Sequence, residues 1–280
     1  HEVRVYCHSS LYKKKPRKVN GIKLIYTPSI ETKFLSQIVN SFFSFIHVCF
    51  TKVDVVLVLN SANGPFGLLT KIFGLKTCIN VDGLEWLRPK WKGLGSLYFK
   101  VASKLSTIMF DQVISDSYQM KNVYLKKFKK NSIVIAYGPT IKKAKQKKEL
   151  DRFSLKTNEF YLIVGRLIPD NNAVNIIKGF IKSKSKKKLV IVGDVPYNDK
   201  YSNKAKSYAC TKIIFTGYVK SEKILSQLYN NCYGYIHGHQ FGGTNPTMIN
   251  SLAINCSVLA LNTRFTQEML KNKHSIFFEN

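Results

Sequence analysis

The sequence feature that most constrains the fold is an alternation of short β-branched runs with longer helical stretches, which occurs twice along the chain. In the first half we expect strands at residues 3–7, 22–27, 53–60, 76–81, 111–115 and 132–137. Helices are expected between them, at 34–50, 64–73, 94–110 and 116–128. Such alternation is typical of an α/β domain with a mostly parallel sheet, because parallel neighbours are joined by crossover helices.

A second series follows a polar, lysine-rich and aperiodic stretch at residues 138–157. Its expected strands are 160–165, 187–194, 212–217, 232–237, 257–262 and 275–280, and its expected helices are 173–183, 197–209, 221–230 and 247–254. We therefore predict two facing doubly wound Rossmann-like domains, at 1–140 and 158–280, joined by a linker at 141–157. The first strand starts almost at His1 and the last has no closing helix, so we expect a chain truncated at both ends.

Composition agrees with this architecture and narrows the partners. The 280 residues are 45% hydrophobic, which suffices for two cores. The net charge of +28 makes an anionic partner plausible, and on charge alone a nucleic-acid binder stays open. However, the lysines form short, scattered runs without a nucleic-acid-binding motif, so we expect no nucleic acid partner. An anionic membrane surface or an anionic substrate explains the charge equally well.

Cysteine and hydropathy patterns bear on metals and membranes. The six cysteines are scattered and include no CxxC pair, which favours free thiols in a reducing compartment. No unbroken apolar run reaches the ~18 residues that a membrane span needs. Polar residues interrupt the most apolar segment, 34–50, so we expect a helix docked on a core; a helix lying at a membrane surface is the alternative.

The second half contains three turns that can carry chemistry. Arg166, in VGRLIPDNN, lies between a buried strand and a helix, where it could bind phosphate or be an ordinary surface arginine. The backbone of residues 217–219, in FTGYV, could lie against a planar base. In HGHQFGGTNPTMIN (237–250), the two glycines permit close approach of a ligand, and the next two residues suit the start of a helix that faces an anion. His237 and His239 lie on one side of an extended segment but lack further metal-ligand partners, so we expect no zinc site.

The first half has one unusual turn, INVDGLEWLRPKW (79–91). Asp82 follows a buried strand and precedes Glu85 and Trp86. Indole faces stack on sugar rings, and a carboxylate accepts hydroxyl hydrogens, so the turn could bind a saccharide. The alternative is a turn that tryptophan anchors to the domain core.

Taken together, NVDGLEWLRPKW (80–91), YCHSSLY (6–12), ISDS (114–117), GRLIPDNN (165–172) and HGHQFGGTNP (237–246) resemble the retaining GT-B glycosyltransferases of family 4. More narrowly, they resemble the bacterial rhamnosyltransferase branch that builds capsule and cell-wall polysaccharides. The resemblance spans nearly the whole chain, and the DGLEW and HGHxxGGTNP stretches are its specific parts.

The resemblance implies a hexosyltransferase that moves a hexosyl or deoxyhexosyl group, rhamnosyl above all, from a nucleotide-sugar such as dTDP-rhamnose to a polyprenyl-diphosphate-linked saccharide. It implies retention of configuration, no cofactor, no metal and a cytoplasmic location at the inner face of the cell membrane. Asp82 would orient the reacting groups, with Glu85 and Trp86 on the acceptor side. The implied donor-binding residues are Arg166, Gly217, Tyr218, Val219, His239, Gly242, Gly243, Thr244, Asn245 and Asn250.

Three departures from the family leave alternatives open. Asn250 stands where relatives have a glutamate that grips the donor ribose, and Asn171 and Asn172 stand where many relatives have a lysine. The glycine-rich first strand and loop of the family would precede His1. The alternatives are the same fold with a UDP- or GDP-sugar donor, or a degenerate, non-catalytic fragment.

Overall fold

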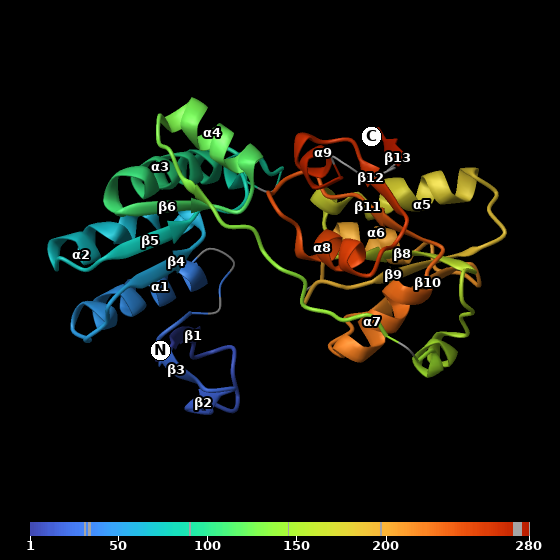
Figure 1. Ribbon diagram of the computed structural model, residues 1–280, viewed down its shortest axis with the longest axis horizontal. Helices are drawn as coiled ribbons and strands as arrows, with labels where there is room; N and C mark the ends of the chain where they lie inside the picture. Colours follow the sequence, from blue (N-terminus) through green and yellow to red (C-terminus); the bar gives the residue numbers. More distant parts are fainter. Residues whose placement is uncertain are drawn as a thin grey trace. The chain divides into compact units, whose positions relative to one another are not determined.

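The computed structural model describes residues 1–30, 32, 35–89, 91–144, 146–196, 198–270 and 276–279. Contacts divide the chain into two compact units (Figure 1). The first comprises His1–Trp86, Gly93–Ser115 and Lys121–Ile133; the second comprises Leu87–Lys92, Asp116–Met120 and Val134–Asn280. Two short segments from the N-terminal half thus pack with the second unit, and both contribute to the site described below.

The first unit holds two small sheets. In one, β1 (Arg4–His8) runs parallel to β3 (Ile22–Thr27), and β2 (Lys18–Val19) pairs antiparallel with β3. The other has the order β4 (Val56–Leu59), β5 (Thr77–Asn80), β6 (Gln112–Ser115), β7 (Ile133–Val134). The helices of this half are α1 (Leu35–Cys49), α2 (Gly67–Ile72), α3 (Leu94–Met109) and α4 (Tyr118–Phe128), with 3-10 turns η1 (Ser61–Phe66) and η2 (Glu85–Leu87).

The second unit is built on one six-stranded parallel sheet. Its strands are β8 (Phe160–Val164), β9 (Lys188–Val192), β10 (Ile213–Gly217), β11 (Gly234–His237), β12 (Val258–Leu261) and β13 (Ile276–Phe278), in the order β10-β9-β8-β11-β12-β13. Its helices are α5 (Ala173–Lys182), α6 (Lys200–Lys206), α7 (Glu222–Asn231), α8 (Pro246–Ala253) and α9 (Arg264–Leu270), with 3-10 turns η3 (Lys148–Phe153) and η4 (Pro169–Asn171). This order is the doubly wound one, which reverses direction between β8 and β11.

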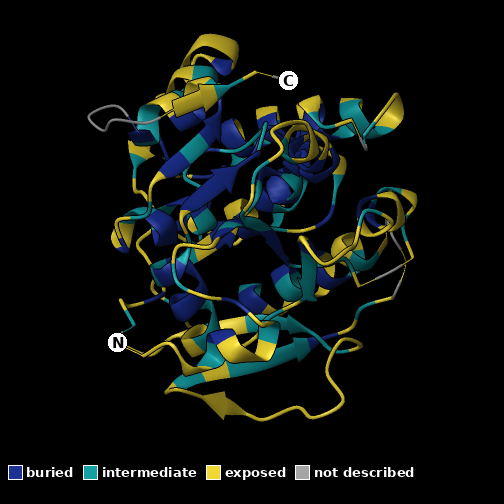
Figure 2. Cartoon of the chain, turned by 90° about the vertical axis from the view of Figure 1, so that its right-hand side faces the viewer, coloured by how far each residue is buried: buried dark blue, intermediate teal, exposed yellow. Residues whose placement is uncertain are grey.

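Alternating side chains of the β8–β12 strands build a core on each face of this sheet. Phe160 and Leu162 of β8 join a cluster with residues of α7, α8 and α9, whereas Ile163 joins a cluster with residues of α5 and α6. Figure 2 shows these central strands as largely buried. Burial on both faces explains the nearly continuous apolar runs of the sequence, which are typical of parallel strands.

The α/β class with mostly parallel sheets is therefore confirmed, and the doubly wound order is seen in the six-stranded sheet. Most expected elements lie within a few residues of their predicted bounds. The strand expected at 275–280 is seen as Ile276–Phe278, with residues 275 and 280 outside the described part. Likewise, residue 34 of the helix expected at 34–50, and residue 197 of the helix expected at 197–209, are not described. Among the helices and strands of the described residues, strand β2, which pairs with the predicted β3, and helix α9 were not predicted.

The segment 141–157, predicted as a linker from its polar composition, is packed onto the second unit. Its buried side chains Ile141, Leu150 and Leu155 join the α7–α8 core cluster. The 3-10 turn η3 forms within the segment, and the Glu149 backbone N–H donates to the Gln227 side chain (2.8 Å). These three apolar residues, at irregular spacing, anchor a segment whose polar composition had indicated an exposed linker.

Candidate functional site

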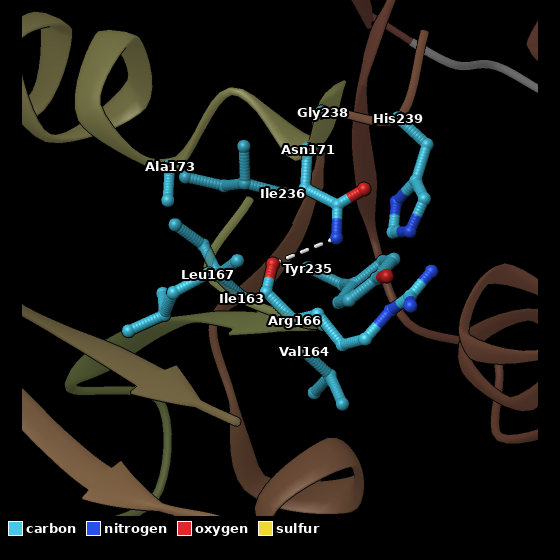
Figure 3. Close-up of a pocket in the computed structure, with 11 residues that line it drawn as sticks. Ile163, Val164, Arg166, Leu167, Asn171, Ala173, Tyr235, Ile236, Gly238 and His239 are labelled. Carbon is cyan, nitrogen blue, oxygen red and sulfur yellow. Dashed lines mark hydrogen bonds between the residues drawn. The ribbon is translucent and has the colours of Figure 1, made fainter. Parts of the chain in front are cut away.

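The loops after β8 and β11 meet at the carboxyl edge of the second sheet, where its strand order reverses. This is the position at which open α/β sheets bind ligands. Arg166 follows β8, and His239 follows β11. Figure 3 shows the guanidinium of Arg166 and the imidazole of His239 extending toward the same side. Beneath them lies a cavity of about 10 Å³, lined in part by Leu167, Tyr235 and Asn171, which is room for about one water molecule.

Two glycines let these loops approach each other. A Cβ on Gly165 would lie 3.2 Å from the His239 ring, and one on Gly238 would lie 2.5 Å from the Asn171 carbonyl oxygen. The neighbouring asparagines fasten the loops: the Asn171 side chain donates to the Arg166 carbonyl (2.8 Å, dashed in Figure 3), and the Asn172 side chain donates to the Gly238 carbonyl (2.8 Å). The two asparagines found in place of the usual lysine therefore bind backbone and fix the loops.

The two histidines of this site are electrically neutral near pH 7. Their rings stack with centroids 4.7 Å apart, and His237 Nδ1 lies 3.0 Å from the Tyr235 hydroxyl. Burial, together with the positive charges of Arg88 and Arg166, lowers the pKa of His239 to about 3. Burial also holds the pKa of His237 well below its usual value. Neutral imidazole can still donate one hydrogen bond, so His239 can hydrogen-bond to an anion although it carries no charge.

A second arginine, to which the sequence assigned no role, belongs to the same unit. Arg88, in the segment Leu87–Lys92, places Nη1 3.7 Å from Oδ2 of Asp170, and the two side chains are only 15% and 8% exposed. Asp170 lies four residues after Arg166, and its carbonyl accepts a hydrogen bond from the Gln240 backbone N–H (3.0 Å). The sequence signal was weak: both residues occur within motifs quoted above, but their pairing spans 82 positions along the chain.

The Gly-Gly-Thr-Asn turn serves a purpose partly different from the one expected. A Cβ on Gly243 would lie 1.8 Å from Oδ1 of Asp116, a buried residue of the Asp116–Met120 segment. The Asp116 carboxylate accepts from the Thr244 backbone N–H (2.8 Å), and the Thr244 hydroxyl donates to the Asp116 carbonyl. A glycine at position 243 thus leaves room for the Asp116 carboxylate, and the Thr244 N–H already donates to that carboxylate.

The other two residues of the turn fit the prediction more closely. Gly242 has φ +121 with open space around it, so its backbone stays accessible. Asn245 begins α8 as its N-cap, where its side-chain oxygen accepts from the Thr247 backbone N–H (3.0 Å). The predicted helix start is therefore confirmed. Of the four residues, Gly242 is the one left free of these contacts.

Asn250 also has protein partners. It is buried in α8, its Oδ1 accepts from the Thr140 backbone N–H (2.9 Å), and its Nδ2 donates to the Thr140 hydroxyl (3.1 Å). Both ends of the amide are therefore used without a ligand. The ribose-binding role expected of this position stays a prediction, and the contacts give Asn250 a structural role as well.

The segment expected to hold a base lies at the end of β10. Gly217 has φ +69 at a register irregularity of the strand, and its carbonyl accepts from the Gly193 backbone N–H (2.8 Å). Tyr218 is 79% exposed, whereas Val219 packs partly against the α7–α8 core cluster. An exposed ring beside a left-handed glycine leaves this backbone open to a flat ligand.

In the first unit, the turn after β5 is packed more deeply than expected. Trp86 is buried, with its ring edge-on to Tyr124 (6.2 Å) and Phe128 (5.8 Å). The burial of Trp86 corrects the expectation that its indole is open for stacking on a sugar. The turn instead matches the alternative, in which the tryptophan anchors it to the domain core. Glu85 is also buried, whereas Asp82 is partly exposed.

In the part of the chain that the structure describes, no three His, Cys, Asp or Glu side chains gather where a metal ion could bind. None of the helices within the described ranges has the length and hydropathy required to cross a bilayer.

Comparison with known proteins gives the site its context. Residues 144–280 match the family Glycosyl transferases group 1, and residues 35–140 match a domain of unknown function, DUF1972. No curated protein sequence matches the chain.

Solved structures match over most of the chain. Sucrose-phosphate synthase from Thermosynechococcus elongatus is similar with a TM-score of 0.80 and 11% identity, over 99% of this chain and 76% of that one. HepE of Anabaena in complex with UDP-glucose is similar with a TM-score of 0.71 and 13% identity, over 92% and 72%. TarM is similar with a TM-score of 0.65 and 14% identity; 88% of this chain matches about half (49%) of TarM. Residues 144–280 therefore match the Glycosyl transferases group 1 family, and the chain as a whole has the GT-B fold of these solved structures.

Proposed function

We propose that the chain transfers a hexosyl group from a nucleotide-sugar to a saccharide acceptor, and that the donor diphosphate binds beside Arg166 and His239. The observation that carries the proposal is the convergence of these two side chains at the point where the strand order of the second sheet reverses. The HepE complexes, which contain UDP and UDP-glucose in a protein of the same fold, support a nucleotide-sugar donor.

The chemistry that such a site must perform is charge stabilisation. The bond between the anomeric carbon and a phosphate oxygen breaks, and negative charge develops on the departing diphosphate. A fixed guanidinium and a neutral imidazole donor counter this charge without needing to reorganise. We therefore propose that transfer needs no divalent metal. The test is turnover in the presence of a chelator, which should leave the rate unchanged.

Retention is compatible with a reaction on one face of the sugar. The acceptor oxygen forms its bond to the anomeric carbon on the side that the phosphate leaves, and the acceptor proton passes to the departing phosphate oxygen. No strong base is needed. In this scheme Asp82 orients the reacting hydroxyl groups, as the family resemblance implies.

For the donor sugar we propose rhamnose, carried by dTDP, on the resemblance of the DGLEW and HGHxxGGTNP stretches. A UDP-sugar is the second candidate, and the UDP complexes of HepE favour including it in every assay. A nucleotide panel separates both from a degenerate, non-catalytic chain, which would bind no nucleotide.

For the acceptor we propose a polyprenyl-diphosphate-linked saccharide at an anionic membrane surface. Helix α1 supports this proposal because it exposes Leu35, Ile38, Phe42 and Phe43, as an interfacial helix does. The lysine-rich composition supplies the electrostatic attraction. Flotation with anionic vesicles, but not with neutral ones, is the expected result, and equal recovery with both would count against it.

The deciding experiment is a transfer assay with dTDP-rhamnose, UDP-glucose and a GDP-sugar, each with a short-chain polyprenyl-diphosphate saccharide. We expect product with one donor, and loss of product in Arg166→Ala. Nucleotide hydrolysis or transfer that Arg166→Ala leaves unchanged would refute the proposed site.

A further inference from the structure

Two of the six cysteines lie close together beside the α7–α8 core cluster of the second unit. Cys232 follows helix α7 and Cys256 precedes strand β12, and both are free thiols. The Cys232 thiol donates to the backbone carbonyl of Tyr229 (3.3 Å), and the Cys256 thiol donates to the same carbonyl (3.1 Å). Because both sulfur atoms contact one oxygen, they are near neighbours although they are far apart in the sequence.

The pairing of β11 with β12 explains why these thiols meet. The two strands run parallel with Tyr235 opposite Val258, and the Tyr235 N–H donates to the Ser257 carbonyl (2.8 Å) (Figure 1). Each cysteine comes just before its strand, so both enter the sheet at the same end. Neighbouring strands lie about 4.8 Å apart, and the Cα atoms of a disulfide are about 4.4–6.8 Å apart. Strand pairing therefore brings the two cysteines within the reach of a disulfide bond.

Cys256 is the thiol of the pair that ionises more readily. The hydrogen bond from the Cys232 side chain lowers the pKa of Cys256 below its ordinary value. The same interaction, together with burial, raises the pKa of Cys232. Both residues are partly exposed, and Cys256 lies between the exposed residues Asn255 and Ser257. A small reagent can therefore reach Cys256, and it is the thiolate form that attacks a disulfide.

We propose that Cys232 and Cys256 form a redox-active thiol pair, which closes to an intramolecular disulfide when it meets a small-molecule disulfide. The Cys256 thiolate attacks one sulfur of the small disulfide, so a mixed disulfide forms and one small thiolate leaves. Cys232 then gives up its proton and attacks the Cys256 sulfur, which forms the internal S–S bond and releases the second small thiolate. The two cysteines lose two electrons in all, and the small disulfide is reduced to two thiols.

The bridge joins the two ends of a segment that contains part of the candidate site. Residues 232–256 include strand β11, His239 and helix α8. A cross-link between the ends of this segment restricts the unfolded chain, so the oxidised protein should melt at a higher temperature than the reduced one. The reaction needs neither donor nor acceptor, so this inference is independent of the proposed function.

The competing explanation is that the two thiols only cap helix α7. Tyr229 lies in the last turn of α7, where backbone carbonyls lack a partner within the helix. Two thiol donors satisfy its carbonyl. In that case the cysteines need not react with each other, and a serine at either position would serve as well.

The experiment is incubation of the reduced, folded chain with oxidised glutathione, followed by blocking of the remaining thiols and mass-spectrometric peptide mapping without reduction. We expect a peptide pair linked through Cys232 and Cys256 within one chain, and reversal of the link by dithiothreitol. In Cys232→Ser, Cys256 should keep glutathione as a stable mixed disulfide, because no second thiol displaces it. Cys210→Ser is the matched control, since Cys210 is an exposed free thiol, and it should form the bridge at the unmodified rate.

The unmodified chain alone decides the inference, so the test holds even if a serine variant fails to fold. Glutathione on both cysteines without a link between them, no modification of either, or a link found only between two chains would overturn it. Equal melting temperatures of the bridged and the reduced chain would overturn the stabilising effect of the bridge.

Discussion

Replacement of Gly243 by alanine tests why the Gly-Gly-Thr-Asn turn contains its second glycine. The added Cβ would lie 1.8 Å from Oδ1, 2.4 Å from Cγ and 2.5 Å from Oδ2 of Asp116. Real Cβ atoms do not approach other atoms this closely, so the carboxylate must leave. The variant therefore loses the hydrogen bond between the Thr244 N–H and Asp116.

The size of the effect follows from that bond. A hydrogen bond to a charged group contributes about 1.5–3 kcal/mol, and Asp116→Ala should lose a similar amount. In the double variant, the alanine at position 243 no longer meets a carboxylate. Its stability should therefore be close to that of Asp116→Ala alone, with a coupling free energy of about 1.5–3 kcal/mol between the two positions.

Gly242→Ala is the matched control on the adjacent residue. A Cβ at Gly242 meets nothing within 4 Å, but its φ of +121 strains any other residue, which costs about 1–3 kcal/mol. Because the cause is backbone strain, Asp116→Ala should not relieve it.

Urea unfolding of the single and double variants measures these free energies, and hydrogen exchange of the Thr244 amide reports the local bond. Additive losses for Gly243→Ala and Asp116→Ala would refute the account of this turn.

Three further predictions follow from the site. Asp82→Asn should leave UDP or dTDP affinity unchanged in titration while lowering the transfer rate about 100-fold or more, since orientation and electrostatics act in the transition state; an unaltered rate dismisses the role. Asn250→Ala should lower the free energy of unfolding by about 1–3 kcal/mol because the Thr140 N–H loses its acceptor, whereas Asn250→Asp keeps an acceptor and should lose less in thermal melts. His237 and His239 have lowered pKa values when folded, so below about pH 6.5 the unfolded chain binds more protons and stability should fall as the pH drops; His239→Gln should flatten this dependence, and an equal slope in melts at pH 5 to 7 would contradict it.

Local sequence pattern predicted the sheet but missed two small elements for local reasons. The β2–β3 hairpin turns at Asn20-Gly21, both with positive φ, which is the sequence signature of a two-residue hairpin turn. The Asn-Gly signal did not lead to a predicted hairpin, because strand β2 beside it is only two residues long. Helix α9 has seven residues, and its start depends on mutual contacts of Thr263 and Thr266, which resemble ordinary loop polarity in sequence.

The sequence predicted those site residues that directly follow a strand. It did not predict contacts between residues that lie far apart in the sequence. Arg166 and His239 follow buried strands, so the rule that ligands bind at carboxyl edges brings them together. Asp116 and Thr244 are 128 residues apart, and nothing local indicates that a carboxylate occupies the turn. For the same reason, the sequence did not indicate that Asp116 occupies the position of a Cβ at Gly243; the donor-binding role of Gly243 stays a prediction.

Trp86 shows the opposite error, in which local chemistry was given too much weight. An exposed indole beside two acids would suit a sugar, but the neighbours that bury Trp86 lie on α4, about forty residues later. Burial against Tyr124 and Phe128 depends on tertiary packing, which the turn sequence alone does not encode.

We propose above that the site beside Arg166 binds a nucleoside diphosphate through its phosphates. The most direct measurement is titration of the unmodified chain, Arg166→Ala and the surface control Arg152→Ala with UDP, dTDP and GDP. We predict saturable binding of at least one of them, a loss of about 10-fold or more in Arg166→Ala, and no change in the control. Equal affinity in all three proteins, or no binding in any, would contradict the claim.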